Sequence, residues 1–235
     1  MTHEFDLAVS LDRVLAAPSP SPSPARPRAL ILDFAGVLTA DPGPVLRAWC
    51  TASGLPAGAW RHALTEHPRG RLLYRELEAG RIGQAEWNAR TAPLLGPHVE
   101  PENLMGRAWA GVPAAPRMIA LARAARAAGL RLALLSNSFG LDPHDPYRHA
   151  GVRDLFDVRV LSEEVGMAKP DPAIYRHTLD LLGLPGRDCV FADDRSENLA
   201  PAAALGITTV HVTDETRAVT ALAGLLDLPV PRAAP

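Results

Sequence analysis

The stretch Arg28–Thr39, RALILDFAGVLT, decides the fold of this chain. Its apolar run 29–32 has the composition of a buried β-strand, and the run ends at Asp33, shortly before a break at Gly36. In open α/β sheets, ligands bind at the carboxyl ends of the strands. We therefore predict that Asp33 belongs to the functional site and that the rest of the chain is arranged around this strand.

After Pro113 the sequence alternates between helical and strand-like segments. Helices are predicted over 116–128, 172–182, 196–205 and 215–226, and strands over 131–135, 157–161, 189–192 and 207–212. Strands that are separated by helices of this length form right-handed βαβ units. The predicted fold class is therefore α/β, with a doubly wound parallel sheet that makes a Rossmann-like core.

The segment between the first strand and Pro113 has a different pattern. It shows short helical periods broken by glycine and proline, without strand alternation, and it holds all four tryptophans of the chain. We predict a small all-helical cap at 42–112, inserted into an α/β core that comprises 27–41 and 113–235. The alternating prolines and serines at 18–24 place a flexible linker within an N-terminal segment, residues 1–26.

Composition predicts a soluble globular protein of 235 residues with a net charge of −2. No basic run favours nucleic acid, no apolar run reaches the roughly 18 residues of a membrane span, and the N-terminus does not resemble a signal peptide. Cys50 and Cys189 lie too far apart for a metal-binding pair. We expect a cytoplasmic enzyme, a monomer or homodimer, whose partner is a small-molecule substrate rather than nucleic acid or membrane.

Three later segments bring polar groups to the ends of predicted strands or the loops beside them. They carry Ser136 and Asn137, then Lys169, and finally the run DDRSEN at 193–198. Lys169 is the only lysine among many arginines, which indicates that a lysine is needed there, although chance survival is the alternative. Taken singly, each of these polar residues is common in turns and loops. Together at one sheet edge they predict a site.

The motifs DFAGVLT at 33–39, SNS at 136–138, KP at 169–170 and DDRSEN at 193–198 resemble those of the haloacid dehalogenase-like (HAD) hydrolase superfamily, in the branch with a helical cap after the first motif. The resemblance implies that Asp33 is the nucleophile that forms an aspartyl-phosphate. It also implies that Lys169 neutralises charge, while Ser136 and Asn137 bind the phosphoryl group. The implied function is a phosphatase that acts on a small phosphorylated metabolite.

The same resemblance implies a Mg²⁺ cofactor. Its expected ligands are Asp33, the backbone carbonyl of Ala35 and Asp194, with Asp193 bound directly or through water. Asn198 is expected to orient Lys169 or a metal-bound water.

The sequence departs from the family pattern at Ala35, where HAD phosphatases carry a second aspartate that acts as general acid and base. A methyl group transfers no proton, and the loss of such a group typically costs about 10² to 10⁴ in rate. One interpretation is a phosphatase whose leaving group is already good, such as an acyl phosphate. Another is that the proton comes from Asp41, from His144 or from a residue of the cap.

Two further interpretations stay open at this point. Haloacid dehalogenases break carbon–halogen bonds without Mg²⁺, but their fourth motif is less acidic than the pair Asp193 and Asp194. Phosphonoacetaldehyde hydrolases carry alanine where Ala35 stands, but they need a cap lysine, and this chain has none. That mechanism is therefore unavailable here, and the second open interpretation is a catalytically weak HAD fold kept for binding or regulation.

Overall fold

The computed structural model describes residues 26–231. The predicted flexible segment 1–26 therefore lies, apart from Arg26, outside the described residues. Arg26 itself is tied to the core, because its guanidinium lies 3.0 Å from a carboxylate oxygen of Asp227 at the end of the last helix.

A parallel sheet of five strands forms the centre of the core, in the order β3-β2-β1-β4-β5. The strands are β1 (Ala29–Leu32), β2 (Arg131–Ser136), β3 (Val158–Leu161), β4 (Cys189–Asp193) and β5 (Thr208–His211). The predicted fold class is confirmed, and each predicted strand is found within a residue of its expected ends. All four residues of β1 are buried, as expected for the central strand of a parallel sheet that is covered on both faces.

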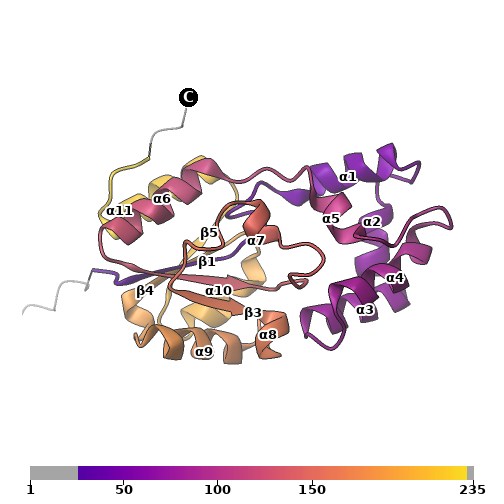
Figure 1. The fold of residues 1–235 in the computed structure, drawn as a ribbon. Coiled ribbons are helices and arrows are strands. Elements are labelled where there is room, and N and C mark those ends of the chain that lie inside the picture. The colour runs from indigo at the N-terminus through magenta and orange to yellow at the C-terminus, as the bar shows by residue number, and fades with distance from the viewer. Residues whose placement is uncertain (1–25, 232–235) are drawn as a thin grey trace, which may run out of the picture.

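Helices cover both faces of the sheet (Figure 1). The helices α6 (Pro116–Ala127) and α11 (Glu215–Leu226) pack together on one face, and α9 (Pro172–Leu182) and α10 (Ser196–Ala203) on the other. Because successive strand residues point to opposite faces, Leu30 and Leu32 join the apolar cluster under α6 and α11. Ala29 and Ile31 join the cluster under α9 and α10. The short elements α7 (Pro146–His149), α8 (Ser162–Val165) and η2 (Gly186–Asp188) lie in the connections.

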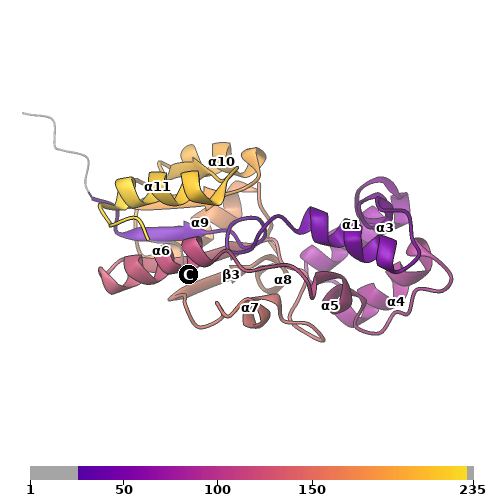
Figure 2. The same cartoon turned by 90° about the horizontal axis from the view of Figure 1, so that it is seen from above.

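The segment that follows β1 forms a second lobe beside the core, to the right in Figures 1 and 2. We call residues 42–112 the helical insertion. Its elements are α1 (Pro42–Ala52), α2 (Ala59–Arg61), the π-helical turn η1 (His62–Glu66), α3 (Pro68–Glu78), α4 (Gln84–Leu95) and α5 (Leu104–Trp109). Trp60 lies at its centre, with ring centroids 5.6 Å from Trp49 and 5.8 Å from Trp87.

Two features join the helical insertion to the core. The apolar cluster under α6 continues without a break into the insertion, so that one core serves both lobes. In addition, the buried carboxamide of Gln84 in α4 donates to the carbonyls of Phe139, Gly140 and His144 and accepts from the backbone N–H of His144 at 2.9 Å. This side chain satisfies the backbone of a core loop that follows β2.

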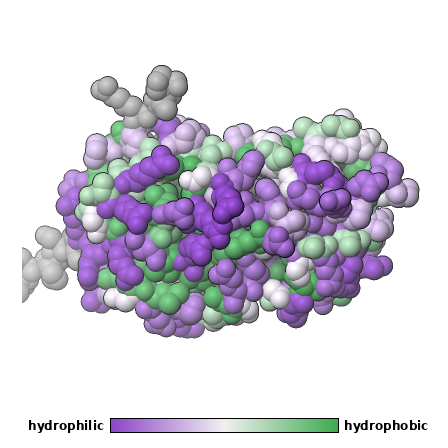
Figure 3. Space-filling view, viewed as in Figure 1, coloured by the Kyte–Doolittle hydropathy of each residue, from purple (hydrophilic) through white to green (hydrophobic). Residues whose placement is uncertain are grey.

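Hydrophilic residues are spread over both lobes on the face shown in Figure 3, with apolar residues scattered between them. Within residues 26–231, none of the helices combines the length and the apolar character needed to cross a membrane.

Candidate active site

The candidate site lies at the carboxyl edge of the sheet, where the chain order reverses on either side of β1. Strand β1 pairs with β4 in a register that sets Leu32 opposite Ala192, and the backbone N–H of Asp33 donates to the Ala192 carbonyl at 3.0 Å. Asp33 and Asp193, the residues that follow this pair, therefore lie side by side. Such a switch point is where α/β sheets form their ligand crevice.

Lys169 connects the two aspartates. Its ammonium Nζ donates to Asp33 Oδ1 at 2.7 Å and to Asp193 Oδ2 at 2.6 Å. The Lys169 side chain is 2% exposed, and the Asp33 side chain is 10% exposed, so the ion pair is almost dry. The lone lysine of the chain thus occupies the one position among the described residues where an ammonium bridges two buried carboxylates.

The backbone of Lys169 is fixed by Asn137, which follows β2. The Asn137 side chain donates from Nδ2 to the Lys169 carbonyl at 2.9 Å and accepts from the Lys169 N–H at 2.8 Å. The sequence predicted a phosphoryl-binding role for Asn137. Its observed contacts show that its carboxamide also holds the loop that carries Lys169.

Asn198 contacts the other carboxylate of the ion pair, Asp193. Its Nδ2 donates to Asp193 Oδ1 at 2.9 Å rather than to Lys169, and the backbone N–H of Arg195 donates to the same oxygen at 2.9 Å. Because Asp193 Oδ2 holds the Lys169 ammonium, both Asp193 oxygens are occupied by donors. Asn198 therefore orients Asp193, and only through it Lys169.

Asp194 is half-buried and faces the turn after Asp33. A Cβ on Gly36, which has a φ of +76°, would lie 2.8 Å from Asp194 Oδ2, so only glycine lets this carboxylate come so close. Oxygens of Asp33, Asp193 and Asp194 lie within 4.8 Å of one another. Three carboxylate oxygens in one place suit a hard cation such as Mg²⁺, and the donor set fits the predicted cofactor.

Burial and nearby charges together set the pKa values of the ionisable groups at this site. Burial raises the pKa of Asp33, and the Lys169 ammonium opposes that rise. Burial lowers the pKa of Lys169, but the charges of Asp33 and Asp193 more than offset this and raise it overall. Burial, together with the nearby charges of Asp33 and Asp193, raises the pKa of the Asp194 carboxyl to about 7.

A cavity of about 430 Å³ opens over these residues, between the core and the helical insertion. Asp33, Ala35, Ser136, Lys169 and Asp194 line its floor. Asn137 and Asn198 also line it, so that of the predicted site residues only the wholly buried Asp193 does not reach the cavity. The helical insertion contributes charged and aromatic walls, namely Arg47, Trp60, Arg61, Tyr74, Glu78 and Trp109.

Asp41 and His144 were the two residues named as alternative proton donors in place of the aspartate missing at Ala35. The structure places Asp41 at this cavity and His144 elsewhere. Asp41 caps α1 by accepting from the Gly43 N–H at 2.8 Å. His144 lines a separate hollow beside α7. Glu78 reaches the cavity from the last turn of α3. No sequence pattern pointed to it, because the face that a helix turns toward a neighbouring lobe does not follow from its own pattern.

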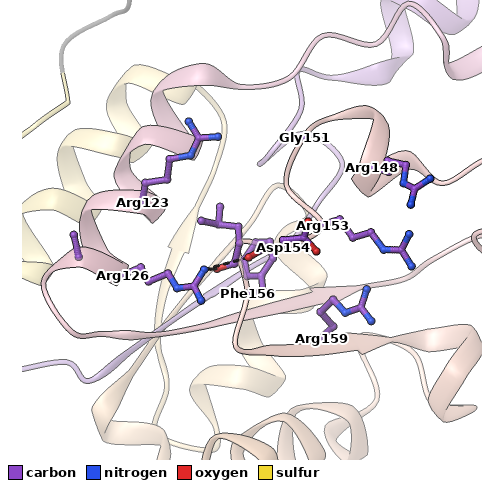
Figure 4. Close-up of a pocket in the computed structure, with 10 residues that line it drawn as sticks. Arg123, Arg126, Arg148, Gly151, Arg153, Asp154, Phe156 and Arg159 are labelled. Carbon is purple, nitrogen blue, oxygen red and sulfur yellow. Dashed lines mark hydrogen bonds between the residues drawn. The ribbon is translucent and has the colours of Figure 1, made fainter.

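A second, open hollow of about 1180 Å³ lies on the core around α6, α7 and β3. Figure 4 shows five arginines around it, Arg123, Arg126, Arg148, Arg153 and Arg159. Arg126 lies 3.6 Å from Asp157, and Arg153 lies 3.1 Å from Asp145. These arginines are scattered in the sequence and meet only in the fold, and none of the motif residues lines this hollow.

Comparisons with known proteins agree with this geometry. Acyl-CoA dehydrogenase family member 10 of Mus musculus is 31% identical over 217 residues, which are 86% of this chain and 19% of that protein. Sesquiterpene phosphatase astK of Aspergillus oryzae is 33% identical over 98 residues, which are 42% of this chain and 50% of that protein. The chain therefore spans about a fifth to a half of these two relatives.

A HAD family enzyme of Bacteroides thetaiotaomicron, solved in complex with magnesium and inorganic phosphate, has the same fold, with a TM-score of 0.63 and 23% identity over 79% of this chain and 93% of that one. The family model of haloacid dehalogenase-like hydrolases matches residues 27–206, which include all four motifs. This chain belongs to the haloacid dehalogenase-like hydrolases.

Proposed function

We propose that this hydrolase is a Mg²⁺-dependent phosphatase that acts on a small phosphorylated metabolite. The observation that carries the proposal is the Lys169 ammonium, which lies 2.7 Å from Asp33 Oδ1 and 2.6 Å from Asp193 Oδ2 at the floor of the cavity. Phosphoryl transfer to a carboxylate brings two anions together, and a fixed buried cation lowers the cost of that approach.

The residues of the chain have distinct parts in this reaction. Asp33 attacks phosphorus, the bond to the leaving oxygen breaks, and an aspartyl-phosphate forms that water later hydrolyses. Lys169 neutralises Asp33 and the transferred group. Ser136, buried at the end of β2 and lining the cavity, donates to a phosphoryl oxygen.

Asp33, Asp194 and the carbonyl of Ala35 are the groups we assign to Mg²⁺, with Asp193 contributing through water, because both of its oxygens already accept hydrogen bonds. When bound, the ion supplies charge neutralisation for the phosphoryl oxygens. The similar Bacteroides enzyme was solved with magnesium and phosphate, which supports the assignment.

The lining of the cavity favours a substrate that has an apolar part as well as a phosphate group. Leu46, Trp60, Leu64, Trp109 and Phe139 line it, opposite the charged floor. A sesquiterpene phosphatase is among the relatives, and its substrates combine these two characters. The volume of about 430 Å³ lies within the range of small-molecule sites.

The test is phosphate release from acetyl phosphate and p-nitrophenyl phosphate, with and without Mg²⁺. We expect turnover that needs the ion and that is abolished in Asp33→Asn, which keeps the size of the side chain but removes the nucleophile. Asp157→Asn, on an aspartate away from the cavity, is the matched control and should retain turnover. Release that survives in Asp33→Asn at the wild-type rate would contradict the proposal.

A further inference from the structure

The proposed reaction needs a general acid, and the usual position for it in this chain, Ala35, has none. When the bond from phosphorus to the leaving oxygen breaks, that oxygen needs a proton unless the leaving group is already stable as an anion. Ala35, at the position where the family carries the acid, has only a methyl group. A phosphatase of ordinary esters built on this chain therefore needs another proton donor at the same cavity.

Apart from the Asp33, Lys169 and Asp194 set, the described residues that line the cavity include four acids, Asp41, Tyr74, Glu78 and Tyr147. Burial raises the pKa of both tyrosine hydroxyls far above its usual value, which makes them poor donors at neutral pH. Asp41 is exposed and is engaged as the cap of α1. Glu78 is the remaining carboxyl.

Glu78 is held over the cavity by its place in α3. It is the last residue of the helix and follows Tyr74 by one turn, so the two side chains share one face of α3, and both line the cavity. Two residues further on, Gly80 has a φ of +67°, and a Cβ there would lie 2.1 Å from the Glu163 carbonyl oxygen. This close packing on α8 fixes the end of α3 against the core.

We propose that Glu78 is the general acid and base that replaces the missing aspartate, an inference that rests on the proposed phosphatase function. As Asp33 attacks phosphorus, the Glu78 carboxyl gives its proton to the departing oxygen, which leaves as an alcohol. The Glu78 carboxylate then takes a proton from the water that attacks the aspartyl-phosphate. Asp33 is released as a carboxylate, phosphate leaves, and Glu78 is protonated again.

The surroundings of Glu78 suit this exchange. Burial raises the pKa of its carboxyl, while the charges of Arg195, Arg75 and Lys169 oppose that rise. Helix α8, which packs against α3, carries two further acidic residues, Glu163 and Glu164. A carboxyl whose pKa is raised keeps its proton to a higher pH than a free glutamate does, which suits a group that acts first as an acid and then as a base.

The experiment compares two aryl phosphates of the same shape, p-nitrophenyl phosphate and phenyl phosphate, with Mg²⁺ present. The measured quantity is kcat/KM, which reports transfer to Asp33 and not the later hydrolysis. Because nitrophenolate leaves without a proton, Glu78→Gln should lower kcat/KM on this substrate by less than about 5-fold, whereas on phenyl phosphate the loss should approach 10².

Two variants separate proton transfer from structure. Glu76→Gln changes a glutamate of the same helix that does not line the cavity, and it should leave both substrates unaffected. Adding Ala35→Asp to Glu78→Gln restores the acid of the family and should recover turnover of phenyl phosphate. The high-pH limb of the wild-type kcat/KM profile on phenyl phosphate should be absent in Glu78→Gln.

Equal losses on both substrates, or no loss on phenyl phosphate, would overturn the assignment of Glu78 while the p-nitrophenyl turnover that depends on Asp33 still supports the phosphatase. Absence of turnover on p-nitrophenyl and acetyl phosphate in the wild type would instead remove the proposed function, and this inference with it. Acid-quenched mass spectrometry gives a second readout, since phosphorylated Asp33 should accumulate in Glu78→Gln, which has lost the base for its hydrolysis.

Discussion

Lys169 shows how much one side chain decides in this molecule. Its ammonium is buried between Asp33 and Asp193, and an arginine there would have to fit a planar fork into a space built for one nitrogen. Asn137 and Asn198 support the arrangement from two sides, one through the backbone of Lys169 and one through Asp193. The arrangement of Asp33 and Asp193 thus depends on the two hydrogen bonds that the Lys169 ammonium donates.

Replacing Lys169 by methionine should destabilise the fold in a pH-dependent way. The variant keeps the volume but leaves two buried carboxylates without their cation, which typically costs about 3 kcal/mol. Without the opposing ammonium, burial leaves the folded-state pKa of Asp33 above its unfolded value, so the penalty is full above that folded pKa and is relieved as pH falls through it. Urea unfolding of wild type and variant without added divalent cation measures this, and a deficit that grows toward acid would contradict it.

At the scale of the elements, the end of α3 controls how the helical insertion meets the site. The helix begins at Pro68 with His67 as its cap, and it ends two residues before the Gly80 contact with α8. Glu78 therefore lies two residues before a close backbone contact with the core.

Gly80→Ala should lower both stability and activity. Its φ of +67° costs about 1 to 2 kcal/mol for an alanine, and the new Cβ would push α3 away from Glu163. Phosphatase turnover should fall with it, because Glu78 moves. The matched control is Gly224→Ala in α11, where nothing lies within 4 Å of the new Cβ. That change should raise the unfolding free energy by about 0.5 to 1 kcal/mol and leave turnover unchanged.

At the scale of the whole molecule, we expect the two lobes to unfold as one cooperative unit. A continuous apolar cluster runs from β1 and α6 into the helical insertion, and Gln84 satisfies four backbone groups of the core loop 139–144. All four tryptophans lie in the insertion, so their fluorescence reports that lobe, while far-UV circular dichroism reports both. We expect coincident denaturation curves from the two probes.

Gln84→Leu should cost about 3 kcal/mol of unfolding free energy, because it leaves the His144 N–H and the loop carbonyls buried without partners. Thr91→Val is the matched control on the same helix. The Thr91 hydroxyl is buried without a hydrogen-bond partner in the described structure, so its loss should be neutral or slightly stabilising. Chemical denaturation followed by both probes tests the pair, and equal effects of the two variants would refute the role of Gln84.

The sequence by itself determined the strands, the helices of the core and the placement of Asp33, Ser136, Lys169 and Asp194 at one edge. Local patterns suffice for this, because a parallel sheet gathers the carboxyl ends of its strands whatever the detailed packing. What local patterns do not supply is the hydrogen-bond partner of each amide. Asn137 and Asn198 are short polar side chains whose contacts depend on ångström-scale placement of the loops that face them.

Only the tertiary structure decided which residues of the helical insertion face the site. The orientation of one packed lobe on another is set by contacts that are distant in sequence, here the Gly80 packing on Glu163 and the bonds of Gln84 to the loop after β2. Among the charged side chains of α3, it is Glu78 that lines the same cavity as Ala35. Helical periodicity defines the faces of α3, but it does not say which face meets the other lobe.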